Sequence, residues 1–163
     1  MNRLASVLTV ADVEVDVVAR SKLALFAEAA MLFERHGSGV AASTVTDALF
    51  AREQLASTSL GHGVAIPHAR VKGLKAPVAS MIRVKEPLAF GGPDEEPVTL
   101  FVFLFVPELA TQSHLELLAE IAEMLADKTI REPLKHQGDA AFVYATIAGW
   151  MPRGATGSPA RRS

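Results

Sequence analysis

The hydrophobic pattern along the chain predicts three buried strands and a weaker fourth. Residues 98–106 (VTLFVFLFV) form an apolar run, which is typical of a central strand covered on both faces. Residues 78–84, rich in apolar and β-branched residues, predict a second strand. A short apolar run at 64–66 predicts a third, ended by Pro67, which has no N–H group and fixes its own φ. In residues 12–17 acidic residues alternate with valines, which predicts either a short edge strand or an extended lead-in.

Hydrophobic residues spaced three and four apart predict two helices before the strand at 64–66. The first covers 22–36, with Ser21 as its N-cap and a glycine at its end. The second begins at Ser43 or Thr44 and runs to about residue 54. Arg52 lies at the end of the apolar stripe of this second helix, where an arginine usually extends its charged group to solvent.

Three more helices are predicted after the strand at 98–106. Ser113 and Glu116 have the spacing of a capping box, which predicts that a long helix starts at His114 and continues to 126. A short helix follows, beginning at 127 or 128 and running to about 137, and a last one, capped by Asp139, runs to about 148. The residues of the last helix expected to pack inward are Phe142, Ile147 and Trp150.

Helices that precede, separate and follow a few apolar strands favour an α/β layered fold, with the sheet buried between helices. Residues 55–63, 71–77 and 86–97 are predicted loops; the last is dense in proline and glycine. Residues 1–150 are expected to form a single domain. Residues 151–163 (MPRGATGSPARRS) are predicted to be a disordered tail.

Composition excludes several classes of protein. The 163 residues are half hydrophobic, which is enough for a substantial core, and the net charge of −2 gives no electrostatic basis for binding nucleic acid. There is no cysteine, and so no disulfide, thiol nucleophile or thiolate metal site. The N-terminus lacks a secretion signal, and no apolar run is long enough to span a bilayer as a helix. A soluble cytoplasmic protein, without insertion into a membrane, is therefore expected.

Three residues with useful chemistry are placed where they can converge. His68 directly follows Pro67 at a strand end, where α/β proteins carry their reactive groups. His114 is predicted in the first turn of a helix, whose free N–H groups suit phosphate and disfavour a protonated histidine. Arg52 offers a planar fork for two phosphate oxygens. Together they form a candidate phosphohistidine site, with His68 as acceptor, His114 as hydrogen-bonding partner and Arg52 as charge clamp.

Other interpretations of these histidines remain open. The segment after Pro67 can be a plain surface turn, and His114 a half-buried histidine of the helix. Arg35-His36-Gly37 matches the short signature of histidine phosphatases, but it ends a helix instead of following a strand, which indicates a chance match. His62, His68 and His114 are in principle zinc ligands, although their spacing fits no compact zinc motif.

Two ordered signatures resemble a known family. The first runs from Arg52-Glu53 through Ser57-Thr58 to 61–70 (GHGVAIPHAR), and the second combines 102–107 (VFLFVP) with 113–122 (SHLELLAEIA). They resemble the fructose–mannitol–nitrogen type of enzyme IIA in the bacterial phosphoenolpyruvate-dependent phosphotransferase system, most of all its nitrogen-regulatory members. The resemblance implies a mixed, roughly five-stranded sheet between helices and no cofactor. It also implies that His68 is phosphorylated by an HPr-like carrier protein, with His114 and Arg52 as the other active-site residues.

Three functions follow from these observations. The leading hypothesis is a phosphocarrier that regulates nitrogen- or potassium-related targets, such as kinases or potassium transport proteins, through its phosphorylation state. The second is a component of fructose- or mannitol-type sugar uptake, in which His68 passes the phosphoryl group to a cysteine of a IIB protein. The third is a non-catalytic sensory or interaction domain with an unused histidine.

Overall fold

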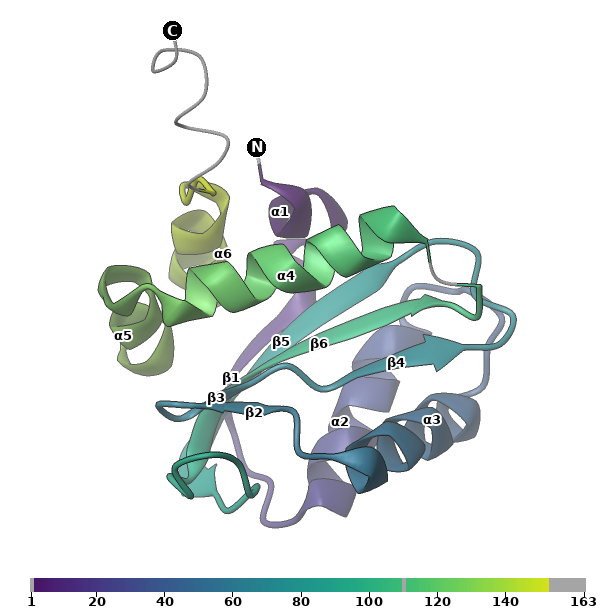
Figure 1. Ribbon diagram of the computed structural model, residues 1–163, viewed down its shortest axis with the longest axis horizontal. Helices are drawn as coiled ribbons and strands as arrows, with labels where there is room; N and C mark the ends of the chain where they lie inside the picture. Colours follow the sequence, from purple (N-terminus) through teal and green to yellow (C-terminus); the bar gives the residue numbers. More distant parts are fainter. Residues whose placement is uncertain (1, 110, 153–163) are drawn as a thin grey trace, which may run out of the picture.

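A computed structural model describes residues 2–109 and 111–152 (Figure 1). The helices are α1 (Arg3–Val7), α2 (Lys22–Glu34), α3 (Ala42–Leu55), α4 (Gln112–Ala126), α5 (Lys128–His136) and α6 (Ala140–Ala148), with a short 3₁₀ turn, η1 (Val10–Asp12). The strands are β1 (Val13–Val17), β2 (Ser59–Gly61), β3 (Val64–Ala65), β4 (His68–Val71), β5 (Val78–Leu88) and β6 (Val98–Pro107).

One mixed sheet forms the centre of the fold, in the order β1-β5-β6-β3-β2, with β4 also paired to β6. β6 pairs antiparallel with β5 on one side and parallel with β3 and β4 on the other. β1 lies at one edge, parallel to β5, which confirms the predicted edge strand. The mixed α/β fold is confirmed, with six strands in the described part of the chain instead of about five.

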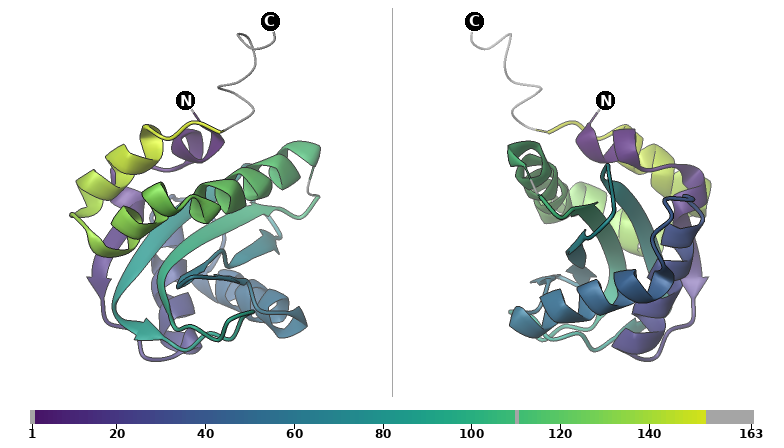
Figure 2. Two further views of the ribbon diagram at one scale, coloured as in Figure 1. Left: turned by 60° about the vertical axis from the view of Figure 1, so that its left-hand side comes forward. Right: turned by 90° about the vertical axis from the view of Figure 1, so that its right-hand side faces the viewer.

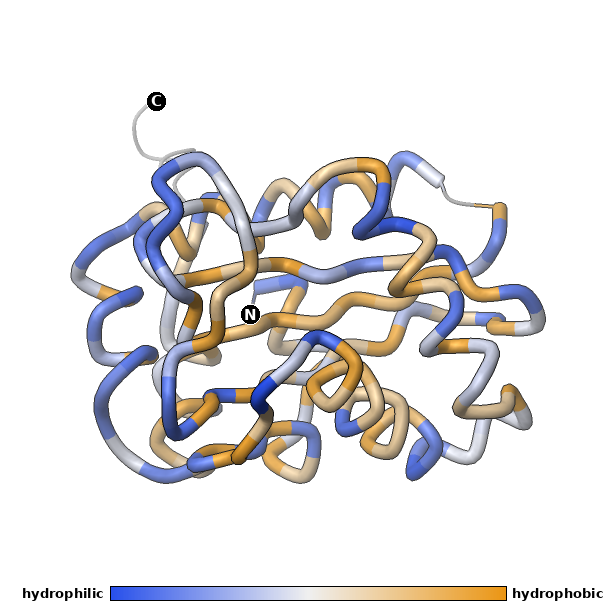
Figure 3. Tube along the Cα trace, turned by 90° about the horizontal axis from the view of Figure 1, so that it is seen from below, coloured by the Kyte–Doolittle hydropathy of each residue, from blue (hydrophilic) through white to orange (hydrophobic). Residues whose placement is uncertain are grey.

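Helices cover both faces of the sheet, as Figures 1 and 2 show: α2 and α3 lie on one face, and α1, α4, α5 and α6 on the other. Alternate side chains of β6 enter the two layers, so that Phe101, Phe103 and Phe105 pack with α2 and α3. Leu100, Val102 and Leu104 pack with α4 and α6. The prediction of a central strand covered on both faces is therefore confirmed. Figure 3 shows the hydrophobic residues running along the strands in the middle of the molecule.

β3 and β4 are two parts of one interrupted strand. Val64 pairs with Leu100 and His68 with Leu104, so the register against β6 continues across the break at Pro67. Pro67 cannot donate to the ladder, but its carbonyl still accepts from Leu104 N at 3.1 Å. The predicted end of a strand before His68 is present, but the chain continues beyond Pro67 as a second strand in the same register. His68 opens β4, because the proline interrupts the hydrogen bonding of the strand without turning the chain away from β6.

The chain reaches β3 through a tight turn over residues 61–63. Gly61 and Gly63 have φ values of 85° and 76°, which confirms the need for glycine there. At Gly63 a Cβ would lie 2.9 Å from Nζ of Lys135, and that lysine donates to the carbonyl of His62 at 2.8 Å. The turn is thus held against α5. The residues before it were expected to be a loop, but Ser59–Gly61 pair with β3 as β2.

Two predicted helix starts were displaced. α4 begins at Gln112, and its capping box is formed by Thr111 and His114 instead of the predicted Ser113 and Glu116. The hydroxyl of Ser113 lies 2.9 Å from that of Thr111. α3 has Ala41 at its N-cap, without a side-chain hydrogen bond. Its first N–H group, that of Ala42, donates at 3.1 Å to the carboxylate of Glu34 in α2, which substitutes for the predicted serine or threonine cap.

The N-caps of α2 and α6 are confirmed: Ser21 accepts from Ala24 N, and Asp139 from Phe142 N. Ile147 and Trp150 are buried as expected, but Phe142 is 39% exposed. Its ring lies over Gly138, where a Cβ would collide with it, instead of facing the core. α1 and η1 were not anticipated.

No helix in the described residues is long and apolar enough to cross a membrane. The predicted disordered tail, 151–163, lies outside the described residues except for its first two.

Candidate functional site

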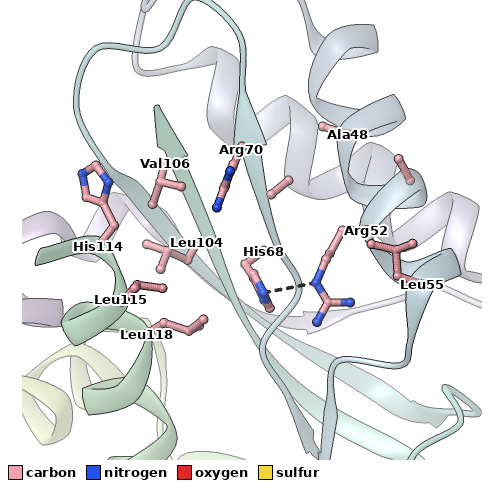
Figure 4. A pocket seen from close by; sticks show the side chains of 12 residues that line it. Ala48, Arg52, Leu55, His68, Arg70, Leu104, Val106, His114, Leu115 and Leu118 are labelled. Carbon is pink, nitrogen blue, oxygen red and sulfur yellow. Dashed lines mark hydrogen bonds between the residues drawn. The ribbon is translucent and has the colours of Figure 1, made fainter. Parts of the chain in front are cut away.

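A groove of about 400 Å³ lies between α3 and α4, over β4 and the end of β6 (Figure 4). It contains all three residues singled out by the sequence, Arg52, His68 and His114. Its walls are otherwise mainly apolar, formed by Ala48, Ala51, Leu55, Ala69, Leu104, Val106, Leu115 and Leu118, with Arg70 as a further charged residue. The three residues that the sequence suggested could converge therefore line one groove of the folded protein.

The His68 ring is oriented by two neighbours. Its Nδ1 lies 2.7 Å from the carbonyl oxygen of Ile66, so Nδ1 carries the proton and donates it. Nε2 accepts a hydrogen bond from Nε of Arg52 at 3.3 Å, which requires a free lone pair on Nε2. His68 is therefore a neutral imidazole whose unprotonated nitrogen is directed at the guanidinium in the groove.

Burial lowers the pKa of His68 below its ordinary value of 6.5. The Ile66 carbonyl opposes this shift, the Arg52 charge adds to it, and Glu53 opposes it. Since burial is the largest of these influences, the ring is neutral, and Nε2 is available as a nucleophile, near pH 7.

Arg52 reaches His68 from the last turn of α3. Its Nη1 donates to the carbonyl of Ala56 at 2.9 Å, one of the free carbonyls at the end of the helix. This second contact holds the guanidinium beside the imidazole, although the two side chains come from different elements.

Glu53 supports the site from behind, and the sequence interpretation gave it no role. It is 8% exposed. Its carboxylate accepts from the backbone N–H and the hydroxyl of Thr58, at 3.1 and 2.8 Å, and lies 3.5 Å from Nζ of Lys22. The signal was available, because Val45, Leu49 and Glu53 are spaced by four residues on one helix face. A carboxylate on such a buried stripe must have partners.

His114 lies in the first turn of α4, as predicted, but not in contact with His68. Figure 4 places it on the other side of Leu104 and Val106 from His68. Its Nδ1 accepts from Thr111 N at 3.0 Å, which leaves the proton on Nε2. Arg52 is thus hydrogen-bonded directly to His68, whereas His114 lies at the far side of the same groove with its Nε2–H available as a donor.

His114 is half-buried, as its alternative interpretation had it, but the zinc and phosphatase interpretations find no support in this geometry. Within residues 2–109 and 111–152, no group of three or more potential metal-ligating side chains is close enough to hold an ion, so the zinc hypothesis for His62, His68 and His114 lacks a cluster. His36, of the phosphatase-like motif, instead lies 2.7 Å from the buried carboxylate of Asp12, beyond the end of α2.

Comparison with known proteins places this fold and site in context. The family model described as "Phosphoenolpyruvate-dependent sugar phosphotransferase system, EIIA 2" matches residues 6–149. The nitrogen regulatory protein of Pseudomonas aeruginosa is 37% identical over 147 residues, which cover 90% of this chain and 96% of that protein. A fructose-specific EIIA component of Haloferax volcanii is 33% identical over 102 residues, covering 63% and 66% of the two chains. The crystal structure of nitrogen regulatory protein IIA-Ntr from Neisseria meningitidis superposes with a TM-score of 0.84 at 42% identity, covering 90% of this chain and 99% of that one.

Proposed function

Since this chain belongs to the EIIA 2 family of the phosphoenolpyruvate-dependent sugar phosphotransferase system, we propose that it carries a phosphoryl group on Nε2 of His68. The observation that carries the proposal is the unprotonated Nε2 of His68. This nitrogen lies in the groove, 3.3 Å from Nε of Arg52. The donor is proposed to be an HPr-like carrier in the cytoplasm. No cofactor is needed, because phosphoryl transfer depends mainly on positioning and charge stabilisation.

The transfer is a displacement at phosphorus. The Nε2 lone pair of His68 forms the new P–N bond while the bond to the carrier's histidine breaks, and the released electron pair stays on the carrier's ring nitrogen. The Nδ1 proton of His68 remains on its ring, held by the Ile66 carbonyl at 2.7 Å. This contact excludes Nδ1 as the acceptor and fixes the ring plane, so the choice of nitrogen is a consequence of the backbone at Ile66.

Two further residues are assigned roles in this proposal. Arg52 neutralises charge on the transferring oxygens, because its planar fork matches two of them. His114 offers its Nε2–H to a phosphoryl oxygen from the other side of the groove, for which its Nδ1 contact with Thr111 already sets the tautomer.

The proposed output is regulation through the phosphorylation state. Phosphorylation adds roughly two negative charges, by analogy with other phosphorylated side chains, to a groove with mainly apolar walls. A target that packs against these walls then binds only one of the two states. The likeness to nitrogen regulatory proteins over 90% of the chain favours nitrogen-related targets. Kinases and potassium transport proteins are further proposed targets, which rest on the resemblance of the two signatures alone. The likeness to a fructose-specific EIIA component favours sugar uptake through a IIB protein as the second candidate.

The intact mass of the protein tests the carrier function. The wild type is incubated with phosphoenolpyruvate, enzyme I and the HPr-like carrier, beside His68→Ala and, as a matched control, His36→Ala. We expect one acid-labile phosphate on the wild type and on His36→Ala, and none on His68→Ala. No gain with a carrier shown to be active would overturn the proposal and leave a binding domain with an unused histidine.

A second measurement separates regulation from sugar uptake. Phosphorylated protein is mixed with a fructose-type IIB protein, and the mass of each protein is followed. Rapid, complete transfer to the IIB cysteine supports uptake. Retention on His68, combined with capture of a target by only one phosphorylation state, supports regulation.

A further inference from the structure

Arg70 lies in the same groove as His68, two residues further along β4. Because side chains alternate along a strand, His68 and Arg70 project from the same face, with Cα atoms roughly 6.6 Å apart. They pair in the ladder with Leu104 and Val106. Figure 4 shows the Arg70 side chain beside His68, on the side nearer Val106.

Arg70 is exposed, and its guanidinium has no hydrogen bond or ion pair within the described part of the chain. Other arginines are engaged: Arg83 donates to the carbonyls at the end of α5, and Arg131 lies 3.1 Å from a Glu132 oxygen. Arg52 donates both to His68 and to Ala56. Arg70 is thus a cation with its full set of donors available.

The groove offers no acidic partner for this charge, since none of its lining residues in the described chain is an aspartate or glutamate. An extended arginine side chain is about as long as the distance between alternate Cα atoms of a strand. The guanidinium of Arg70 can therefore reach over the ring of His68. A phosphoryl group on Nε2 would lie beside Arg52, in the groove that Arg70 also lines and whose walls are mainly apolar.

We propose that Arg70 is a second phosphoryl-binding residue, which engages the oxygens once the group is on His68. The proposal rests on the proposed function of His68. Arg52 donates to Nε2 before transfer, whereas the Arg70 guanidinium has no hydrogen bond to lose among the described residues and gains one when the charge arrives. Arg70 therefore stabilises the phosphorylated state more than the free state, which shifts the transfer equilibrium toward this protein and slows hydrolysis.

The test compares wild type with Arg70→Gln, Arg70→Lys and the matched control Arg20→Gln. Arg20 is also exposed and without a partner in the described residues, but it lies in a separate depression beside Val18 and Glu86. The equilibrium of phosphoryl transfer with the HPr-like carrier is measured by mass. The phosphorus NMR titration of phospho-His68 and its hydrolysis rate are measured alongside.

For Arg70→Gln we expect the equilibrium to shift toward the carrier by roughly threefold to tenfold, as for a partly screened charge-assisted contact. The second ionisation of the phosphoryl group should move to higher pH, and the difference from wild type should shrink at high salt. Arg70→Lys should retain most of the effect, and Arg20→Gln should match wild type. A merely structural role would not move the phosphorus titration.

Two results would overturn the proposal, and they are distinguishable. If wild type is phosphorylated and Arg70→Gln has the same equilibrium, titration and hydrolysis rate, the role of Arg70 is wrong and the carrier function stands. If wild type takes no phosphate from an active carrier, both are wrong. Equal unfolding midpoints of all variants in urea confirm that the exposed substitutions leave the fold intact.

Discussion

At the scale of the residue, the chemistry of His68 is decided by which nitrogen each neighbour contacts. A backbone carbonyl can only accept, so Ile66 fixes the proton on Nδ1. A guanidinium can only donate, so Arg52 requires the lone pair on Nε2. The two contacts agree on one tautomer, and burial favours its neutral form over the imidazolium.

The lowered pKa of His68 predicts how the protein responds to pH. The ring should titrate below 6.5 in NMR, and phosphoryl acceptance should persist to a correspondingly lower pH. Between the folded and unfolded pKa values the unfolded state binds more protons, so His68 makes the free energy of unfolding rise with pH across that window and level off above about 6.5.

Two variants check this assignment. Arg52→Gln should raise the pKa of His68, because it removes a positive charge that disfavours the imidazolium. His68→Gln should remove the contribution of His68 to the pH slope of stability. A ring that titrates at or above 6.5 in the wild type would contradict the assignment of burial as the main influence.

At the scale of the element, the sequence predicted the long strands and helices better than the short segments around the site. Residues 98–107 are apolar except for Thr99, and α4 has a strong helical spacing, so both could be recognised locally. The short apolar run of β3 was recognised, but β2 and β4 hold three and four residues and exist as strands only because β3 and β6 respectively offer a ladder. Such pairing is a tertiary effect, and local pattern cannot supply it.

The candidate site shows the same division. The motif around His68 suggested the chemistry that we propose for it, and the helix pattern placed Arg52 at the end of α3. The distance of 3.3 Å between them depends on how α3 packs beside β4. The separation of His114 from His68 depends on Leu104 and Val106, which lie between them, and the spacing of residues in the sequence carries no information on that.

Glu53 is predicted to hold the end of α3 to the segment that leads into β2. Glu53→Ala should lower the free energy of unfolding by about 1–3 kcal/mol, because it leaves the buried N–H of Thr58 without its acceptor. Phosphorylation of His68 should slow as well, because Arg52 is adjacent to Glu53 in the chain and its position depends on this end of α3. Thr58, the partner of Glu53, directly precedes β2. Urea unfolding and the phosphorylation rate measure the two effects.

The matched control is Gln54→Ala, an exposed substitution one residue further along the helix. It should change neither quantity appreciably. Equal stabilities of the two variants would show that the buried carboxylate is dispensable, and a stability loss without slower phosphorylation would confine Glu53 to a structural role.

At the scale of the whole molecule, the two ends of the described chain are joined on one face of the sheet. α1 and α6 lie side by side there, as Figures 1 and 2 show. Asn2, only 3% exposed, donates to the carbonyls of Ile147 and Trp150 at 2.7 and 2.8 Å and accepts from Ala5 N at 2.8 Å. One side chain thus caps α1 and satisfies the carbonyls at the end of α6.

Asn2→Ala should therefore destabilise the protein by about 1–3 kcal/mol, because the carbonyls of Ile147 and Trp150 and the N–H group of Ala5 each lose a hydrogen bond in a buried position. Ser6→Ala is the control, since among the residues that the structure describes the exposed Ser6 hydroxyl donates only to the carbonyl of Arg3 in the same helix. Urea unfolding gives the stability of both variants.

Hydrogen exchange of the backbone amides distinguishes a local from a global effect of Asn2→Ala. Faster exchange in α6 alone would mean that this helix layer opens independently of the sheet. Faster exchange in both α6 and β6 would mean that the helix layer and the sheet share one core. We expect the second result, because Ile147 packs in the same cluster as Val102 and Leu104 of β6. The loss of stability would then extend to β6, the strand with which β4 and His68 pair.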